Sequence, residues 1–299
     1  MSQESNSLRE TGQGGWRRLS KITLATLLLI GGLGMLTALQ RQLIYFPERA
    51  SENALLSTAD QLGLEAWRDT RGDRIGWRTT LAPDAGRRIV VFHGNAGHAL
   101  HRQYFAAGFL ALNDDWQVFL FEYPGYGART GTPSESVIKA VAIEALQALL
   151  DEEPQPLFLV GESLGSGVAS YLAAHFERQV GGVLLVTPFT SLTDVAKQHY
   201  GFLPVDMLLS ERYDSEQALA GYDGAVAFLI AGEDEVVPAE LGRSLYAGFG
   251  GPKWLQEQPG AGHNSLNYDL AADWWREVTR FWLSTQERAV SDEGTSRAT

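Results

Sequence analysis

Short apolar runs and segments of helical periodicity alternate along the chain from about residue 60 onward. Each apolar run ends at a polar or glycine-rich turn, a pattern that is typical of buried parallel strands. Such strands are predicted at 88–94, 117–123, 156–162, 181–187, 226–234 and 253–259. An antiparallel pair is predicted before them, at 65–70 and 75–82. The alternation of strands and helices predicts a mainly parallel sheet covered by helices.

Helical patterns fill the segments between these strands. The clearest start is at Thr132, which can cap a helix, because Pro133 suits the first helical position and Glu135 completes a capping box. The last helical pattern, over residues 267–286, carries four large aromatic residues, Trp274, Trp275, Phe281 and Trp282. We expect these rings to pack on the sheet and not to form a ligand site.

The N-terminal part contains a run from Ile22 to Leu39 without a charged residue. As a helix this run spans about 27 Å, enough to cross the hydrocarbon core of a bilayer. Basic residues are more frequent before the run than just after it, so we expect the N-terminus to be cytoplasmic and the main domain extracytoplasmic, periplasmic or lumenal. A cleaved signal peptide is the alternative, although no typical cleavage site follows the run.

The predicted organisation has four parts. They are a polar cytoplasmic leader, a single transmembrane helix, one globular domain and a flexible C-terminal tail, at 1–21, 22–39, 40–286 and 287–299. With 299 residues, of which 44% are hydrophobic, the chain can bury one large core. The net charge of −12 argues against nucleic acid or an anionic membrane surface as a main partner. Cysteine is absent, which excludes disulfides, cysteine nucleophiles and thiolate metal sites.

Candidate chemistry lies where the predicted strands end. Ser163 stands in a G-x-S-x-G motif between a strand and a helix, which is the context of a nucleophile elbow. A serine hydroxyl needs a base, and the base needs an acid that orients it. Asp234 and His263 follow two later strands, in the hydrolase order of serine, acid and histidine. Glu233 and Glu235 are alternatives for the acid.

The loop in "VVFHGNAGH" follows an earlier strand and predicts an oxyanion hole. We assign the backbone amides of Asn95 and Leu164 to it, with Ala96 as the alternative in the loop. His93 is expected to brace this loop.

The three histidines His93, His98 and His101 are close in sequence and raise the question of a metal site. No carboxylate or cysteine stands beside them at ligand spacing, so a metal site is disfavoured. We expect no metal and no organic cofactor.

The segment between the strands at 181–187 and 226–234 is too short for an elaborate cap domain. It carries five apolar residues, Phe202, Leu203, Met207, Leu208 and Leu209. Two interpretations stay open, an apolar flap over the site and the ordinary packing of a helix pair.

Taken together, "FHGNAGH", "EYPGYGARTGTPSE", "GESLGSGVA", "TPFTSLTDVA", "GEDEVVP" and "GAGHNSL" resemble the α/β-hydrolase superfamily. More narrowly, they resemble its N-terminally anchored branch, which includes lysophospholipase-like and protein-depalmitoylating members. The resemblance implies a mostly parallel eight-stranded sheet and a triad of Ser163, Asp234 and His263. In these motifs we expect Gly94, Tyr126 and Phe189 to contact the substrate. The chain departs from many relatives at two positions of one loop, Glu122 and Pro124.

The expected activity is that of a serine hydrolase that cleaves ester or thioester bonds through an acyl-enzyme. The membrane span and the resemblance favour lipid acyl substrates such as lysophospholipids or monoacylglycerols. A peptidase or amidase would use the same triad, and a noncatalytic membrane-tethered protein is the alternative from another class. The oligomeric state stays open.

Overall fold

The computed structural model describes residues 32, 35, 39–80, 86–112 and 115–296. The chain divides into two units, Met1–Ile44 and Tyr45–Thr299, and the second contains the sheet. Within the described ranges, no helix is both long enough and apolar enough to cross a membrane. The predicted leader and nearly all of the predicted span at 22–39 lie outside those ranges, so the membrane helix stays a prediction.

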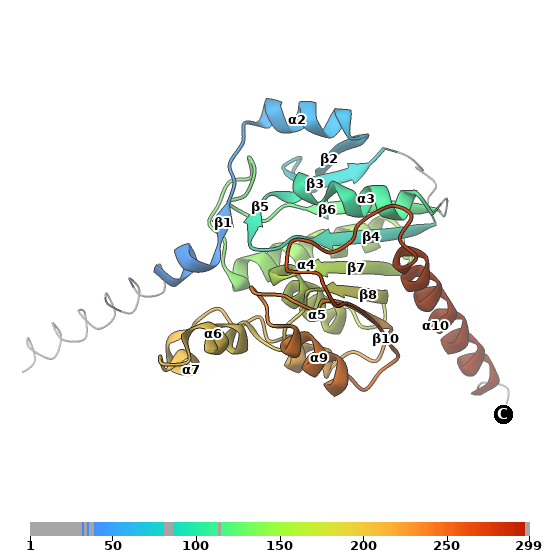
Figure 1. The fold of residues 1–299 in the computed structure, drawn as a ribbon. Coiled ribbons are helices and arrows are strands. Elements are labelled where there is room, and N and C mark those ends of the chain that lie inside the picture. The colour runs from blue at the N-terminus through green and yellow to red at the C-terminus, as the bar shows by residue number, and fades with distance from the viewer. Residues whose placement is uncertain (1–31, 33–34, 36–38, 81–85, 113–114, 297–299) are drawn as a thin grey trace, which may run out of the picture. The chain divides into compact units, whose positions relative to one another are not determined.

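An eight-stranded sheet forms the centre of the second unit, in the order β10-β9-β8-β7-β4-β6-β3-β2 (Figure 1). Only the β2–β3 and β3–β6 pairs are antiparallel. The strands are β2 (Leu64–Arg68), β3 (Arg74–Thr79), β4 (Arg87–Phe92), β6 (Trp116–Phe121), β7 (Leu157–Glu162), β8 (Val180–Val186), β9 (Val226–Ala231) and β10 (Lys253–Gln258). All eight predicted strands are confirmed, and so is the mostly parallel α/β-hydrolase sheet.

The central strands are hydrophobic throughout because both faces of the sheet are covered. In β4, Ile89 pairs with Val118 on one side and with Phe158 on the other. This register aligns the carboxyl ends of β4 and β7, so the loops that follow them emerge at the same edge of the sheet.

Helices pack on both faces of the sheet (Figure 1). The helices α3 and α10 contact β6 and β8, whereas α5 and α9 contact β7 and β9. The longer helices are α2 (Glu52–Gln61), α3 (Gln103–Leu110), α4 (Glu135–Glu152), α5 (Leu164–His175), α6 (Leu192–Tyr200), α9 (Ala239–Gly248) and α10 (Trp274–Ser296). The short ones are η1 (Ala99–Arg102), α7 (Val205–Leu208) and α8 (Ser215–Leu219).

The aromatic residues of α10 pack as the sequence predicts. Trp274, Trp275 and Trp282 are buried in the core, and the indole of Trp282 donates a hydrogen bond to the Val183 carbonyl of β8 at 3.2 Å. Phe281 is partly buried against the same core. These rings are structural.

Three predicted helix boundaries are wrong. Helix α4 is capped by Ser134, whose hydroxyl accepts from the Val137 amide, so the helix begins after Thr132 and Pro133. Helix α10 begins at Trp274, later than the predicted start at 267, and it continues to Ser296, so most of the predicted tail at 287–299 is helical. Residues in this stretch keep helical contacts, as the Arg288 guanidinium donates to the Ser284 carbonyl one turn earlier.

A second, two-stranded sheet lies beside the main one. Strand β1 (Phe46–Pro47) pairs in parallel with β5 (Ala96–Gly97), which belongs to the loop after β4. The pairing brings the chain just after Ile44 against the predicted oxyanion loop.

Candidate active site

Ser163 occupies the sharp turn between β7 and α5. Its φ of 53° and ψ of −120° form a conformation that is rare outside glycine. The flanking glycines allow it: a Cβ on Gly161 would lie within 3.0 Å of the Gly165 backbone, and one on Gly165 within 3.0 Å of the Phe92 backbone. The motif therefore forms the strained strand-to-helix elbow that its sequence context predicts.

Three side chains from distant loops form a chain of hydrogen bonds at this elbow. His263 Nε2 lies 3.1 Å from Ser163 Oγ, and His263 Nδ1 lies 2.7 Å from Asp234 Oδ2. A carboxylate only accepts hydrogen bonds, so Nδ1 carries the proton and Nε2 is free to accept from the serine hydroxyl. This arrangement can move a proton from the hydroxyl to the imidazole while a nucleophile forms.

The carboxylate of Asp234 is fixed in place. Its Oδ1 accepts from the amides of Val236 at 2.9 Å and Val237 at 2.7 Å, and its side chain is 2% exposed. Hydrogen bonds from two amides hold the other oxygen toward His263. The acid that faces the histidine is therefore Asp234, and neither Glu233 nor Glu235 takes that place.

The loop after β4 lies next to the serine. A Cβ on Gly94 would sit 3.5 Å from the Ser163 Cβ, so the absence of a side chain leaves room there. Leu164 is the first residue of α5, where an amide has no partner within the helix. The amide of Leu164 is thus available to an oxyanion, while the assignment of the Asn95 or Ala96 amide stays a prediction.

Three hydrogen bonds fix the conformation of this loop. The Asn95 carbonyl accepts from the Phe46 amide at 2.9 Å and from the Tyr126 hydroxyl at 2.6 Å. His93 is buried, and its Nδ1 donates to the Gly94 carbonyl at 2.7 Å. The predicted bracing role of His93 agrees with this geometry.

The prediction that Tyr126 and Phe189 contact the substrate stays a prediction. Both side chains are buried in the structure, at 0% and 1% exposure. The Tyr126 hydroxyl donates a hydrogen bond to the Asn95 carbonyl. A glycine-rich loop after a strand indicated a site rim, but the sequence carried no sign that this ring turns inward.

Arg102 is a neighbour of the site that the sequence analysis missed. Its guanidinium donates to the carboxylate of Glu162, the residue before the serine, and Tyr104 donates to the same carboxylate at 3.0 Å. Burial alone would lower the pKa of Arg102, but the Glu162 carboxylate raises it above the ordinary value. The ion pair fixes the Arg102 guanidinium beside Gly94, with one nitrogen 3.3 Å from the position that a Gly94 Cβ would take.

The cap segment, residues 187–225, contains α6, α7 and α8 and exposes an apolar surface. Its side chains are Tyr200, Phe202, Leu203, Met207 and Leu208. Phe202 is 83% exposed and Met207 is 87% exposed. The packing of a helix pair therefore does not explain why these two positions are apolar. His199 in α6 donates through Nε2 to the Val236 carbonyl at 2.8 Å, so the cap segment is tied to the loop of Asp234.

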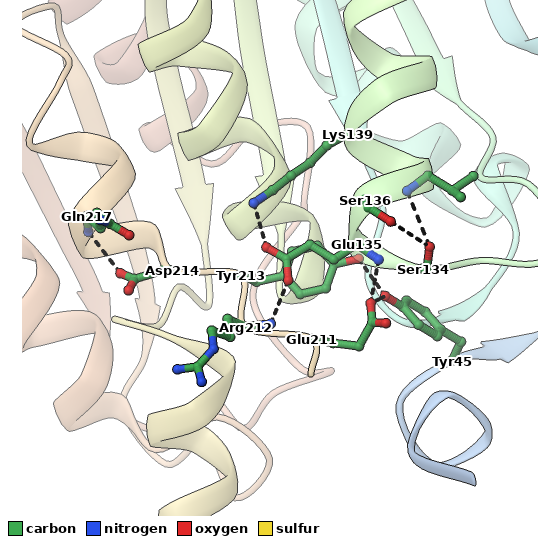
Figure 2. A network of polar contacts seen from close by, with 11 residues as sticks. Tyr45, Ser134, Glu135, Ser136, Lys139, Glu211, Arg212, Tyr213, Asp214 and Gln217 are labelled. Atoms are coloured by element: carbon green, nitrogen blue, oxygen red, sulfur yellow. Dashed lines mark hydrogen bonds and ion pairs between the residues drawn. The ribbon is translucent and has the colours of Figure 1, made fainter. Parts of the chain in front are cut away.

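A second polar network holds the cap segment at residues 211–213 (Figure 2). The Tyr45 hydroxyl donates to Glu211 at 2.6 Å and lies 2.8 Å from the Tyr213 hydroxyl. The first amide of α4, from Glu135, donates to the same Glu211 oxygen, and the Glu135 carboxylate accepts from the Arg212 amide at 2.6 Å. This network, which we call the cap network, therefore joins the residue before β1, the start of α4 and residues 211–213 of the cap segment.

Comparison with known proteins agrees with this fold. A model of the alpha/beta hydrolase fold matches residues 87–228. The uncharacterized protein Rv2307c of Mycobacterium tuberculosis is 32% identical over 262 residues, which cover 83% of this chain and 89% of the relative. The lysophosphatidylserine lipase ABHD12 of Danio rerio is 30% identical over 199 residues, 60% of this chain and 52% of that protein.

A solved structure resembles the chain more remotely. The Pyrococcus furiosus esterase PF2001 aligns with a TM-score of 0.60 at 14% identity, over 81% of this chain and 98% of the esterase. That likeness concerns the fold alone. Together with the relatives in sequence, it leads to one conclusion: the chain belongs to the α/β-hydrolase superfamily.

Proposed function

We propose that the protein is a serine hydrolase that cleaves carboxylic ester or thioester bonds through an acyl-enzyme. The observation that carries the proposal is the hydrogen-bond chain from Ser163 through His263 to Asp234, at 3.1 and 2.7 Å. Such a chain at a strained elbow activates a hydroxyl at neutral pH.

The mechanism follows from this geometry. Ser163 Oγ attacks the acyl carbonyl while His263 Nε2 takes the hydroxyl proton, and Asp234 stabilises the resulting imidazolium. The oxyanion forms beside the Leu164 amide, with an amide of the loop after β4 as the second donor. His263 then gives the proton to the leaving alcohol or thiol, and a water molecule releases the acyl group by the reverse sequence.

The substrates that we propose are acyl lipids, such as lysophospholipids or monoacylglycerols. The support is the exposed apolar surface of the cap segment. A hydrogen bond from His199 ties this segment to the loop of Asp234. A surface of this kind can receive an acyl chain from a lipid aggregate. The name of the Danio rerio relative, a lysophosphatidylserine lipase, points to the same class.

We further propose that residues 22–39 anchor the protein in a membrane as a single span, with the N-terminus cytoplasmic. The support is the uncharged run itself and the basic residues that precede it. The domain would then act on lipids at the extracytoplasmic surface.

A substrate panel tests the proposal. The full chain and its Ser163→Ala variant would be assayed on long-chain lysophospholipid, monoacylglycerol and acyl-thioester, and on a short soluble ester and a peptide amide. We expect serine-dependent hydrolysis of the long-chain esters at higher kcat/KM than that of the short ester. Preference for the amide would replace the proposal by a peptidase, and preference for the short ester would remove lipids as the substrate class.

A further inference from the structure

Three potential metal ligands meet outside the serine site: Glu48, His98 and His101. One ligand atom of each lies within 4.8 Å of the others. The β1–β5 pairing brings them together, because Pro47 lies opposite Gly97 and the Glu48 amide donates to the Gly97 carbonyl at 2.9 Å. The sequence disfavoured a metal site because no carboxylate stands beside the histidines. In the structure the carboxylate of Glu48 reaches them, from fifty positions before His98 in the chain.

His98 is the least explained member of this cluster. It is 6% exposed, and its Nδ1 is buried without a hydrogen-bond partner among the residues that the structure describes. Burial, and then the neighbouring His101, lower the pKa of His98 below its ordinary value. A buried imidazole nitrogen without a partner costs free energy unless a ligand satisfies it.

His101 is held in position by the backbone beside it. Gly97 has φ of +87°, and a Cβ there would lie 2.6 Å from His101 Nδ1, so a side chain would displace the ring. The His98 and His101 rings lie with their centroids 3.8 Å apart. His101 Nε2 faces Glu48 Oε1 at 4.0 Å.

An ordinary ion pair does not account for the cluster. The Glu48 and His101 side chains are 59% and 42% exposed, and 4.0 Å is the outer limit of such a pair, so its contribution to stability is small. It also leaves the buried His98 nitrogen unexplained. A cation among the three groups would use both imidazoles and the carboxylate at once.

We propose that Glu48, His98 and His101 bind a divalent transition metal, with Zn²⁺ as the best match. Two imidazoles and one carboxylate are a known zinc ligand set that leaves a fourth position for water. The half-exposed carboxylate gives the ion a path from solvent. The site is separate from the serine chemistry and does not depend on the proposed function.

The position of this site gives it a structural effect. Glu48 follows β1, whereas His98 and His101 follow the loop of Asn95 and Ala96. A metal ion would cross-link the two segments and stabilise the folded loop, because a ligand that binds only the folded state shifts the unfolding equilibrium. It would act on the loop that flanks Ser163 without touching the reacting atoms.

Calorimetric titration of the full chain with Zn²⁺, after removal of any histidine tag, tests the proposal. The chain is favourable for this because it has six histidines and no cysteine. We expect one ion per chain, with affinity lowered by more than about 10-fold in each of Glu48→Gln and His101→Ala. Both residues are exposed, so these variants avoid the folding risk of changing His98.

Two matched variants define the site. His175→Ala, an exposed histidine at the end of α5, and His263→Ala should keep the parent affinity. Absence of Zn²⁺ binding would overturn the proposal, and so would unchanged binding in both Glu48→Gln and His101→Ala. Loss of binding in His263→Ala would assign the ion to the serine site instead. Absorption bands of bound Co²⁺ should also change in His101→Ala but not in His175→Ala.

Discussion

The nucleophile elbow and the cap segment differ in almost every physical respect. At the elbow, residues 161–165 are buried and glycine backbones touch their neighbours so closely that no Cβ fits. In the cap segment, Phe202 and Met207 are 83% and 87% exposed, and hydrogen bonds at His199 and Glu211 tie the segment to other parts of the domain. The elbow thus depends on backbone geometry that permits few sequences, whereas the exposed surface of the cap segment permits many.

The largest expected effect concerns the acid of the elbow. Replacing Asp234 by Asn should lower kcat by about 10⁴-fold, because an amide favours the wrong imidazole tautomer while the geometry is kept. Steady-state kinetics on any cleaved ester measures this. Glu233→Gln and Glu235→Gln are the matched controls, and each should retain activity within a few-fold of the parent; a comparable loss in either would move the acid to that position.

The second effect tests how tightly the elbow is packed. In Gly165→Ala the new methyl group would meet the Phe92 backbone, which cannot move aside as a flexible side chain could. We expect the free energy of unfolding to fall by about 1–3 kcal/mol and activity to be lost. Gly250→Ala is the control, because nothing lies within 4 Å of its Cβ position. Equal stability of the two variants in urea would contradict the close packing of the elbow.

The third effect concerns the cap network (Figure 2). Tyr45→Phe removes a hydroxyl that donates to the buried Glu211, and burial raises the Tyr45 pKa, so this hydroxyl stays protonated. Leaving the carboxylate short of a donor should cost about 1–3 kcal/mol of unfolding free energy. Tyr200→Phe, at an exposed ring of the cap segment, should change the urea midpoint little. If the two variants unfold alike, the network does not stabilise the fold.

The smallest effect concerns the apolar surface. Met207→Gln and Phe202→Gln should each lower kcat/KM on lipid vesicles by about 10-fold, since full burial of such a side chain is worth about 1.5–3 kcal/mol. Hydrolysis of a short soluble ester should stay the same. Leu62→Gln, at an exposed leucine after α2, serves as the control for lost apolar area. An equal loss on both substrates would show that the cap segment acts on catalysis and not on lipid access.

The strands and the elbow could be predicted from the sequence because their signals are local. A buried parallel strand is apolar at every position, and an elbow needs glycines at fixed distances from the serine. The order of Ser163, Asp234 and His263 then placed three loops at one edge of the sheet. The structure brings these three side chains within hydrogen-bond distance.

Other features depend on which way a side chain turns or on pairing between distant segments. Tyr126 lies in a loop at the site, but its ring turns inward to the Asn95 carbonyl. Glu48 reaches His98 and His101 only through the two-residue β1–β5 pairing. Strands this short leave no periodic pattern. The sequence predicts Thr132 as the cap of α4, whereas Ser134 is the cap in the structure. Both residue types can cap a helix, so the sequence alone does not choose between them.

Covalent labelling with a fluorophosphonate, followed by mass spectrometry of the modified peptide, tests the central claim most directly. The proposed mechanism predicts one label per chain on Ser163 and no label in Ser163→Ala. An excess of a substrate that the protein cleaves should compete with the label and reduce labelling. Stoichiometric labelling of another residue, or labelling that persists in Ser163→Ala, would contradict Ser163 as the nucleophile. Complete absence of labelling in a folded protein would favour a noncatalytic role for this α/β-hydrolase fold.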